Sequence, residues 1–141
     1  MSREELVLEL QNEEFRRQFV SAQVRRFVSG QIRDLREIDF RRWTQKELGM
    51  RAGGMKPNAI SRLENPAYGD YSVNTLLRLA DAFDLGLIVR FAAISEIVEW
   101  NQGISQWSYT PPSFSNDRKL FFSPSVSAGD ETWRLFRELY I

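Results

Sequence analysis

The chain has 141 residues, of which 43% are hydrophobic and 13% aromatic, enough to bury one sizeable core and to predict a single domain with extensions. The sequence contains no cysteine and no histidine, and no Asp/Glu cluster accompanies a glycine-rich loop, so we expect no enzyme, no cofactor and no metal. Nineteen basic residues balance nineteen acidic ones, but residues 16–66 hold twelve Lys or Arg against five Asp or Glu, an asymmetry that favours phosphate binding.

Residues 4–38 predict the first helical region, because apolar residues recur there at helical spacing. Gly30 and Asn12 are the expected breaks, since glycine disfavours helices and asparagine favours caps. Residues 1–27 would then form an N-terminal helical extension. Its aromatic stripe serves core packing or a dimer seam.

Two arginine pairs in this region, Arg16-Arg17 and Arg25-Arg26, lie nine residues apart. On one continuous helix this spacing places the pairs on opposite sides. We therefore predict that they do not form a single stripe that follows a phosphate backbone.

Residues 44–47 form a capping box, in which Thr44 caps the third amide and Glu47 reaches back, and they predict a helix start. This helix should end near Ala52, because Gly53-Gly54 adopts left-handed dihedrals at no steric penalty. Pro57 suits the first turn of a following helix that ends near residues 65–66. Two short helices joined by a glycine turn are therefore predicted.

Ser72 is the predicted cap of a helix that runs through Phe83 and closes at residues 84–86. Residues 87–91 are short, β-branched and aromatic, and predict one strand. Such a strand needs a partner, either its two-fold copy in a dimer or an extended piece of the C-terminal region.

The C-terminal part begins with a short helix that Ser95 should cap. Residues 103–128 are rich in Ser, Pro and Asn without a steady period, which predicts an irregular arm. Asp130-Glu131 should open a last helix that contains Trp133, Phe136, Leu139 and Tyr140.

Residues 44–65 resemble the phage-repressor-like helix-turn-helix family, also called the Cro/C1 or XRE family, and residues 31–37 and 75–83 look like its first and fourth helices. The resemblance covers residues 28–91 and implies a DNA-binding domain, with residues 92–141 left for dimerisation or partner contact. The implied fold is mainly α: a lambda-repressor-like bundle with a long N-terminal helical extension, one short strand, and a C-terminal irregular arm plus helix. Ile60 comes one residue later than the family pattern, and about two extra residues precede Gln45, so both loops carry insertions.

The second short helix has an outward face that is small, polar and basic, because helical spacing turns Ala59, Ile60 and Leu63 inward. In a major groove, Asn pairs well with adenine and Arg with guanine. A solvated helix face is the alternative interpretation. The predicted base-facing residues are Lys56, Pro57, Asn58, Ser61 and Arg62.

Gln45 matches the family position that holds a backbone phosphate, and a helix N-terminus favours an anion there. For Asn65 and Tyr68, just beyond the second helix, ordinary loop hydrogen bonding is the alternative to a phosphate contact. Arg41, Arg42 and Lys46 would add attraction that is independent of base sequence, unless they are simply solvated. Arg36 and Glu64 match family positions that form an internal ion pair, so we assign them a structural role. The predicted phosphate-contacting residues are Thr44, Gln45, Lys46, Asn65 and Tyr68.

The function predicted from these features is that of a transcriptional regulator that binds double-stranded DNA sequence-specifically as a homodimer. One alternative is an antitoxin that represses its own operon while residues 107–123 bind a toxin. Another is an adaptor that kept the fold but lost DNA binding. No apolar run approaches the roughly 18 residues of a membrane helix, and the acidic start is unlike a signal peptide, so we expect a cytoplasmic protein without membrane contact.

Overall fold

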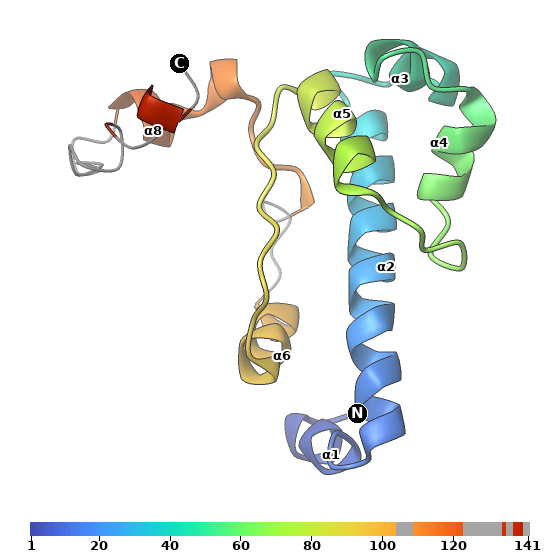
Figure 1. Cartoon of the computed structure of the whole chain (residues 1–141), viewed down its shortest axis with the longest axis vertical. Coiled ribbons are helices and arrows are strands. Elements are labelled where there is room, and N and C mark those ends of the chain that lie inside the picture. The colour runs from blue at the N-terminus through green and yellow to red at the C-terminus, as the bar shows by residue number, and fades with distance from the viewer. Residues whose placement is uncertain (104–108, 123–133, 135–136, 140–141) are drawn as a thin grey trace.

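The structure is a computed structural model that describes residues 1–103, 109–122, 134 and 137–139. The described chain is mainly helical, as predicted. The long helix α2 has α1 at one end and α3, α4 and α5 around the other (Figure 1). None of the described helices combines the length and the hydropathy needed to cross a bilayer. The elements in chain order are α1 (Arg3–Glu9), α2 (Glu13–Glu37), α3 (Gln45–Arg51), α4 (Pro57–Leu63), α5 (Val73–Phe83), α6 (Ile94–Gln102), the 3-10 helix η1 (Phe114–Asn116) and α8 (Arg118–Phe122).

The helix α2 runs for 25 residues without interruption, so the predicted break at Gly30 is wrong. The predicted break at Asn12 is confirmed, since the Asn12 side chain caps α2 by accepting a hydrogen bond from the Phe15 amide at 2.9 Å. A single glycine disfavours a helix by only about 1 kcal/mol, which tertiary packing readily outweighs. Thus α2 passes continuously from the predicted extension into the predicted DNA-binding region.

The core lies where the upper half of α2 meets α3, α4 and α5. Leu48 of α3 and Ile60 of α4 are completely buried, and the Trp43 ring stacks on Phe83 with centroids 5.8 Å apart. Burying aliphatic side chains of this size stabilises a fold by roughly 1.5–3 kcal/mol each. The buried cluster consists of Ile32, Leu35, Leu48, Ala52, Ile60, Leu63, Leu79 and Phe83.

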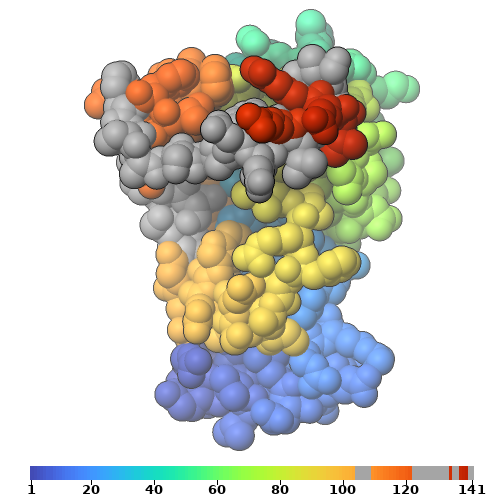
Figure 2. Space-filling view, turned by 60° about the vertical axis from the view of Figure 1, so that its left-hand side comes forward, coloured from blue at the N-terminus to red at the C-terminus, as the bar shows by residue number. Residues whose placement is uncertain are grey.

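The strand predicted at residues 87–91 is wrong: the described chain contains no strand, and residues 86–93 form an extended segment on the surface (Figure 2). Residues 86–92 make no backbone–backbone hydrogen bond with a described segment, and only the Ala93 carbonyl, which caps α6, accepts from the Glu96 and Ile97 amides. A strand is defined by its partner, and β-branched composition alone does not supply one. The side chains of Ile88, Val89 and Phe91 are consequently exposed.

Aromatic stacking attaches the C-terminal part to α2. The Phe27 ring lies with its centroid 4.2 Å from Trp100 of α6 and 4.6 Å from Tyr109. Part of the aromatic stripe on α2 therefore serves packing within one chain. Such ring pairs contribute about 0.5–1.5 kcal/mol beyond their buried area.

The C-terminal part was predicted to contain a helix capped by Ser95, an irregular arm and a last helix. The cap of α6 is Ala93, so the prediction of Ser95 as the cap is wrong. The arm is only partly irregular, because η1 and α8 both lie inside it. Most of the predicted last helix, including Asp130, Trp133 and Tyr140, lies outside the described residues, whereas residues 134 and 137–139 are helical.

Candidate nucleic-acid interface

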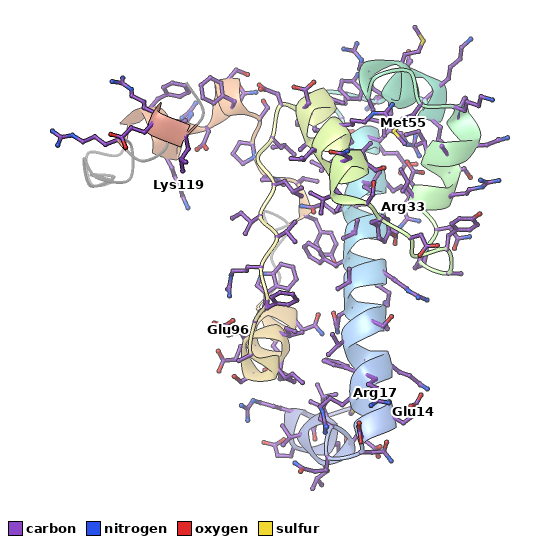
Figure 3. The ribbon with its side chains drawn as sticks, viewed as in Figure 1. Glu14, Arg17, Arg33, Met55, Glu96 and Lys119 are labelled. Atoms are coloured by element: carbon purple, nitrogen blue, oxygen red, sulfur yellow. The ribbon has the colours of Figure 1, made fainter. Side chains whose placement is uncertain are left out.

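The turn between α3 and α4 depends on three glycines. Gly53 and Gly54 have φ of +78° and +83°, in the left-handed region that the sequence predicted for this turn. The Gly49 carbonyl accepts hydrogen bonds from the amides of Gly54 at 3.0 Å and Met55 at 2.8 Å (Met55 in Figure 3). A Cβ on Gly49 would lie 2.1 Å from the Met55 carbonyl oxygen, so only glycine fits there.

Arg78 of α5 closes the same turn from outside, a role that the sequence pattern did not reveal. Its Nε donates to the Ala52 carbonyl at 2.9 Å and a terminal nitrogen donates to the Gly53 carbonyl at 3.1 Å. These carbonyls end α3 and have no intrahelical partner. The turn is therefore held both by its own backbone and by α5.

Arg41 does not point toward a phosphate position, as one interpretation of the sequence suggested. Its guanidinium donates to the carbonyls of Leu35 at 3.1 Å and Phe83 at 2.9 Å, at the ends of α2 and α5. Burial lowers its pKa, and the Asp84 carboxylate opposes that change. Arg41 joins two helix ends, whereas neighbouring Arg42 is exposed and pairs with Asp39 at 3.3 Å.

The outward face of α4 is free of contacts that would shield it from a duplex. Pro57 is the first residue of the helix and Lys56 its cap, and Ile60 and Leu63 point into the core. The Tyr68 ring that lies beside Arg62 is itself exposed, so a duplex could approach this face directly. Every predicted base-facing residue is exposed: Lys56, Pro57, Asn58, Ser61 and Arg62.

The start of α3 and the end of α4 are held together by Gln45. Its side-chain amide donates to Glu64 at 3.1 Å, and Thr44 caps α3 by accepting from the Glu47 amide at 3.1 Å. Thr44 and Lys46 are exposed beside it. One amide hydrogen of Gln45 is thus engaged inside the protein, and the remaining donor stays available for a phosphate.

Beyond α4, Asn65 and Tyr68 have local partners. The Asn65 side-chain oxygen accepts from the Ala67 amide at 2.9 Å, which is ordinary turn geometry. The Arg62 guanidinium lies 5.3 Å from the centroid of the Tyr68 ring, and both side chains are exposed. A cation over a ring face keeps its N–H donors free for other partners.

Arg36 and Glu64 form a two-point ion pair between α2 and the end of α4. The Nε of Arg36 donates to one oxygen of Glu64, and a terminal nitrogen donates to the other at 3.0 Å. A further donor of Arg36 reaches the Trp43 carbonyl at 2.9 Å. The hydrogen bond with Glu64 raises the pKa of Arg36 against the opposing effect of burial, so this guanidinium stays charged at any physiological pH.

A basic groove on α2 contradicts the prediction that the two arginine pairs lie on opposite sides. The groove has a volume of about 410 Å³ and is lined by arginines from both pairs, together with Pro66 from the loop after α4. Arg17 and Arg25 are eight residues apart, which brings them to within about 80° on the helix, and Arg26 is adjacent. We call this the α2 groove, and its lining is Arg17, Gln18, Ser21, Ala22, Arg25, Arg26 and Pro66.

The candidate interface thus comprises the exposed face of α4, the start of α3, and the neighbouring α2 groove, which the sequence did not predict. The eight-residue spacing of Arg17 and Arg25 indicates that they share a side of α2, whereas the nine-residue spacing between the pairs does not. Comparison with protein-family models, with curated proteins and with solved structures found no match for this chain.

Proposed function

We propose that this protein is a transcriptional regulator of the phage-repressor-like helix-turn-helix type that binds double-stranded DNA sequence-specifically. The observation that carries the proposal is the polar and basic outer face of α4, exposed along its length above the fully buried Ile60. A short rigid helix with such a face suits the major groove, where its side chains reach base edges. The turn fixed by Gly49 and Arg78 would hold this helix at a constant angle to α3.

Base recognition is assigned to Asn58 and Arg62, whose exposed side chains have the donors and acceptors that adenine and guanine edges require. Lys46 and the free donor of Gln45 would bind the flanking phosphates. Stacking on Tyr68 would orient the Arg62 guanidinium before DNA arrives. Such ordering reduces the entropy lost on binding.

The first test is a selection of binding sites from random duplexes at fixed salt, with retained sequences read by sequencing. A shared motif is expected. Half-sites should recur about 34–36 Å apart if two recognition helices act across a compact two-fold axis. Retention without any enriched motif would contradict sequence-specific binding.

We predict that Arg62→Ala weakens binding to the selected duplex by about 1–3 kcal/mol and relaxes preference at one base pair, because a base-edge contact is lost. Gln45→Ala should lower affinity for all duplexes alike, since phosphates carry no base identity. Titrations against the selected duplex and its single-base variants separate the two effects. An equal loss on every duplex for Arg62→Ala would remove its assignment to a base.

The homodimer is proposed to form through the extended segment, residues 86–93. Its side chains expose large apolar area to solvent, with Ile88 87% and Val89 65% exposed and Phe91 entirely so. Residues 86–92 make no backbone–backbone hydrogen bond in the described chain, so a second copy could pair with them across a two-fold axis. Monomeric proteins rarely leave such a continuous apolar edge unpaired.

We expect Phe91→Ser to weaken the dimer at least about tenfold, since burial of one aromatic side chain contributes roughly 1.5–3 kcal/mol. Sedimentation equilibrium would give the dissociation constant. Val73→Ser is the matched control, because Val73 is also exposed but lies at the start of α5. Equal dissociation constants for Phe91→Ser and the wild type would exclude this segment from the dimer.

A second candidate function, an antitoxin, is favoured by an exposed aromatic patch on the C-terminal arm. Phe114 and Phe121 contact each other with ring centroids 5.4 Å apart, yet each is more than half exposed, and Leu120 beside them is 59% exposed. Patches of this kind mark protein interaction sites. A protein partner that copurifies with the wild type and is lost from Phe121→Ser would support this role.

A further inference from the structure

We propose that the α2 groove binds the phosphate backbone of the same duplex that α4 reads, extending the DNA contact beyond the two short helices. This inference rests on the proposed function. It adds a second contact surface, on the part of the chain that the sequence assigned to an extension. Figure 3 labels Arg17, at the lower end of this surface, and Arg33, farther up α2.

The charge of the groove favours an anion. Arg25 and Arg26 form no ion pair with a carboxylate of the described chain, and only Arg17 is paired, with Glu13. That pair is highly exposed, so it contributes little and can exchange partners. Phosphate would therefore meet two unpaired guanidinium groups and a third that is weakly held.

The basic surface continues along α2 into a second hollow of about 330 Å³, which shares Arg26 and Pro66 with the α2 groove. Arg33 lines this hollow, and the acidic groups there are Asp34 and Glu64. Glu64 is already paired with Arg36, so its charge is compensated. Arg26 and Arg33 outnumber the remaining acidic group, Asp34, so the lining stays net positive from the groove toward the end of α4.

The groove adjoins the outer face of α4 through the loop after that helix. Arg62 of α4 lies over the Tyr68 ring, and the next residue, Gly69, packs on the Arg25 side chain. A Cβ on Gly69 would lie 2.4 Å from the Arg25 Nε, so the loop backbone is in close contact with α2. Figure 1 shows this loop beside the middle of α2, directly below α4. A duplex seated on α4 could reach Arg25 without a change of fold.

The dimensions suit a polymer backbone. The nine helical steps from Arg17 to Arg26 span about 13.5 Å, roughly four phosphates of one DNA strand at 3.4 Å along the axis. Small-molecule pockets enclose most of their ligand and are lined by apolar groups. The α2 groove is an open surface with three arginines in its lining, which suits a polymer backbone that passes over it better than an enclosed free anion.

The test compares the salt dependence of DNA binding for the wild type and for Arg25→Gln/Arg26→Gln. The probe is a selected duplex that extends ten base pairs past the recognised site on each side. Removing two phosphate contacts should reduce the slope of log Kobs against log salt by about 2. Between 50 and 200 mM salt, the wild-type affinity should therefore fall about tenfold further than that of the variant.

Four controls isolate the groove. Arg118→Gln/Lys119→Gln removes two exposed charges on α8, remote from α2, and should leave the slope unchanged (Figure 3). Arg25→Lys/Arg26→Lys keeps the charge and should restore most of the slope. Thermal unfolding of each variant checks that the loop contact of Arg25 is not needed for folding. On a duplex trimmed to the recognised site, Arg25→Gln/Arg26→Gln and the wild type should have equal slopes.

A slope equal to that of the wild type on the long duplex would overturn the groove proposal while leaving the proposed function intact. A slope deficit that persists on the trimmed duplex would also overturn it, since the contact would not lie beyond the site. Failure of the wild type to bind any duplex would overturn both proposals. If Arg62→Ala weakens binding while Arg25→Gln/Arg26→Gln has the salt slope of the wild type, the groove proposal alone fails and the proposed function stands.

Discussion

Replacing Arg36 with methionine should lower the free energy of unfolding by about 3–5 kcal/mol, because the change leaves the Glu64 carboxylate buried without its main partner. The two side chains are only 11% and 7% exposed, so water cannot compensate for the lost guanidinium. Gln45 would remain as a neutral donor to Glu64, which is weaker than a charged one. The loss should appear as a lower midpoint of urea unfolding with an unchanged slope.

Two comparisons decide whether burial causes this effect. Arg90→Gln breaks an ion pair whose partners are 64% and 51% exposed, and we expect a change below about 1 kcal/mol. The double variant Arg36→Met/Glu64→Met removes both charges and should recover most of the stability lost by the single change. A single variant as stable as the wild type would contradict the structural role of this pair.

The helix starts were the most predictable part of the fold, because caps are local. Thr44, Ser72 and Asn12 each accept a hydrogen bond from an amide three residues ahead, as the sequence indicates. The left-handed glycines after α3 are equally local. Interactions within four residues depend mainly on a short stretch of sequence, so they are the easiest to predict.

Several wrong predictions depended on partners distant in sequence, whereas the Ser95 cap was a local error, since α6 already begins at Ile94. Residues 87–91 have strand composition, but a strand needs a neighbour that the described chain does not provide. Gly30 was expected to break a helix, yet the packing around α2 outweighs its weak propensity. Arg41 bonds to the Phe83 carbonyl, 42 residues away, and no spacing rule anticipates that contact.

The candidate interface likewise has one part that the sequence predicts and another that depends on tertiary structure. The outward direction of Asn58 and Arg62 follows from helical periodicity and agrees with their exposure. Only part of the α2 groove could be predicted, because spacing alone places Arg17 and Arg25 on one side of the helix. Pro66 and Gly69 reach that side only because α4 directs the following loop onto α2, which is a tertiary outcome.

Gly49→Ala should lower the free energy of unfolding by about 2–3 kcal/mol, although alanine is the better helix former. The propensity gain of about 1 kcal/mol is too small to offset a Cβ placed 2.1 Å from the Met55 carbonyl oxygen. The obstacle is backbone, so the turn must open, and the hydrogen bonds of the Gly54 and Met55 amides to the Gly49 carbonyl would weaken.

The matched control is Gly86→Ala, since no atom lies within 4 Å of an added Cβ there and its φ is not in the left-handed region. Its unfolding free energy should stay within about 0.5 kcal/mol of the wild type. Because the turn sets the angle of α4, Gly49→Ala should also weaken binding to the selected duplex under conditions where the protein remains folded. Stability equal to that of Gly86→Ala would mean that the α3–α4 turn tolerates a side chain, and α4 would then lack the fixed seat that groove recognition requires.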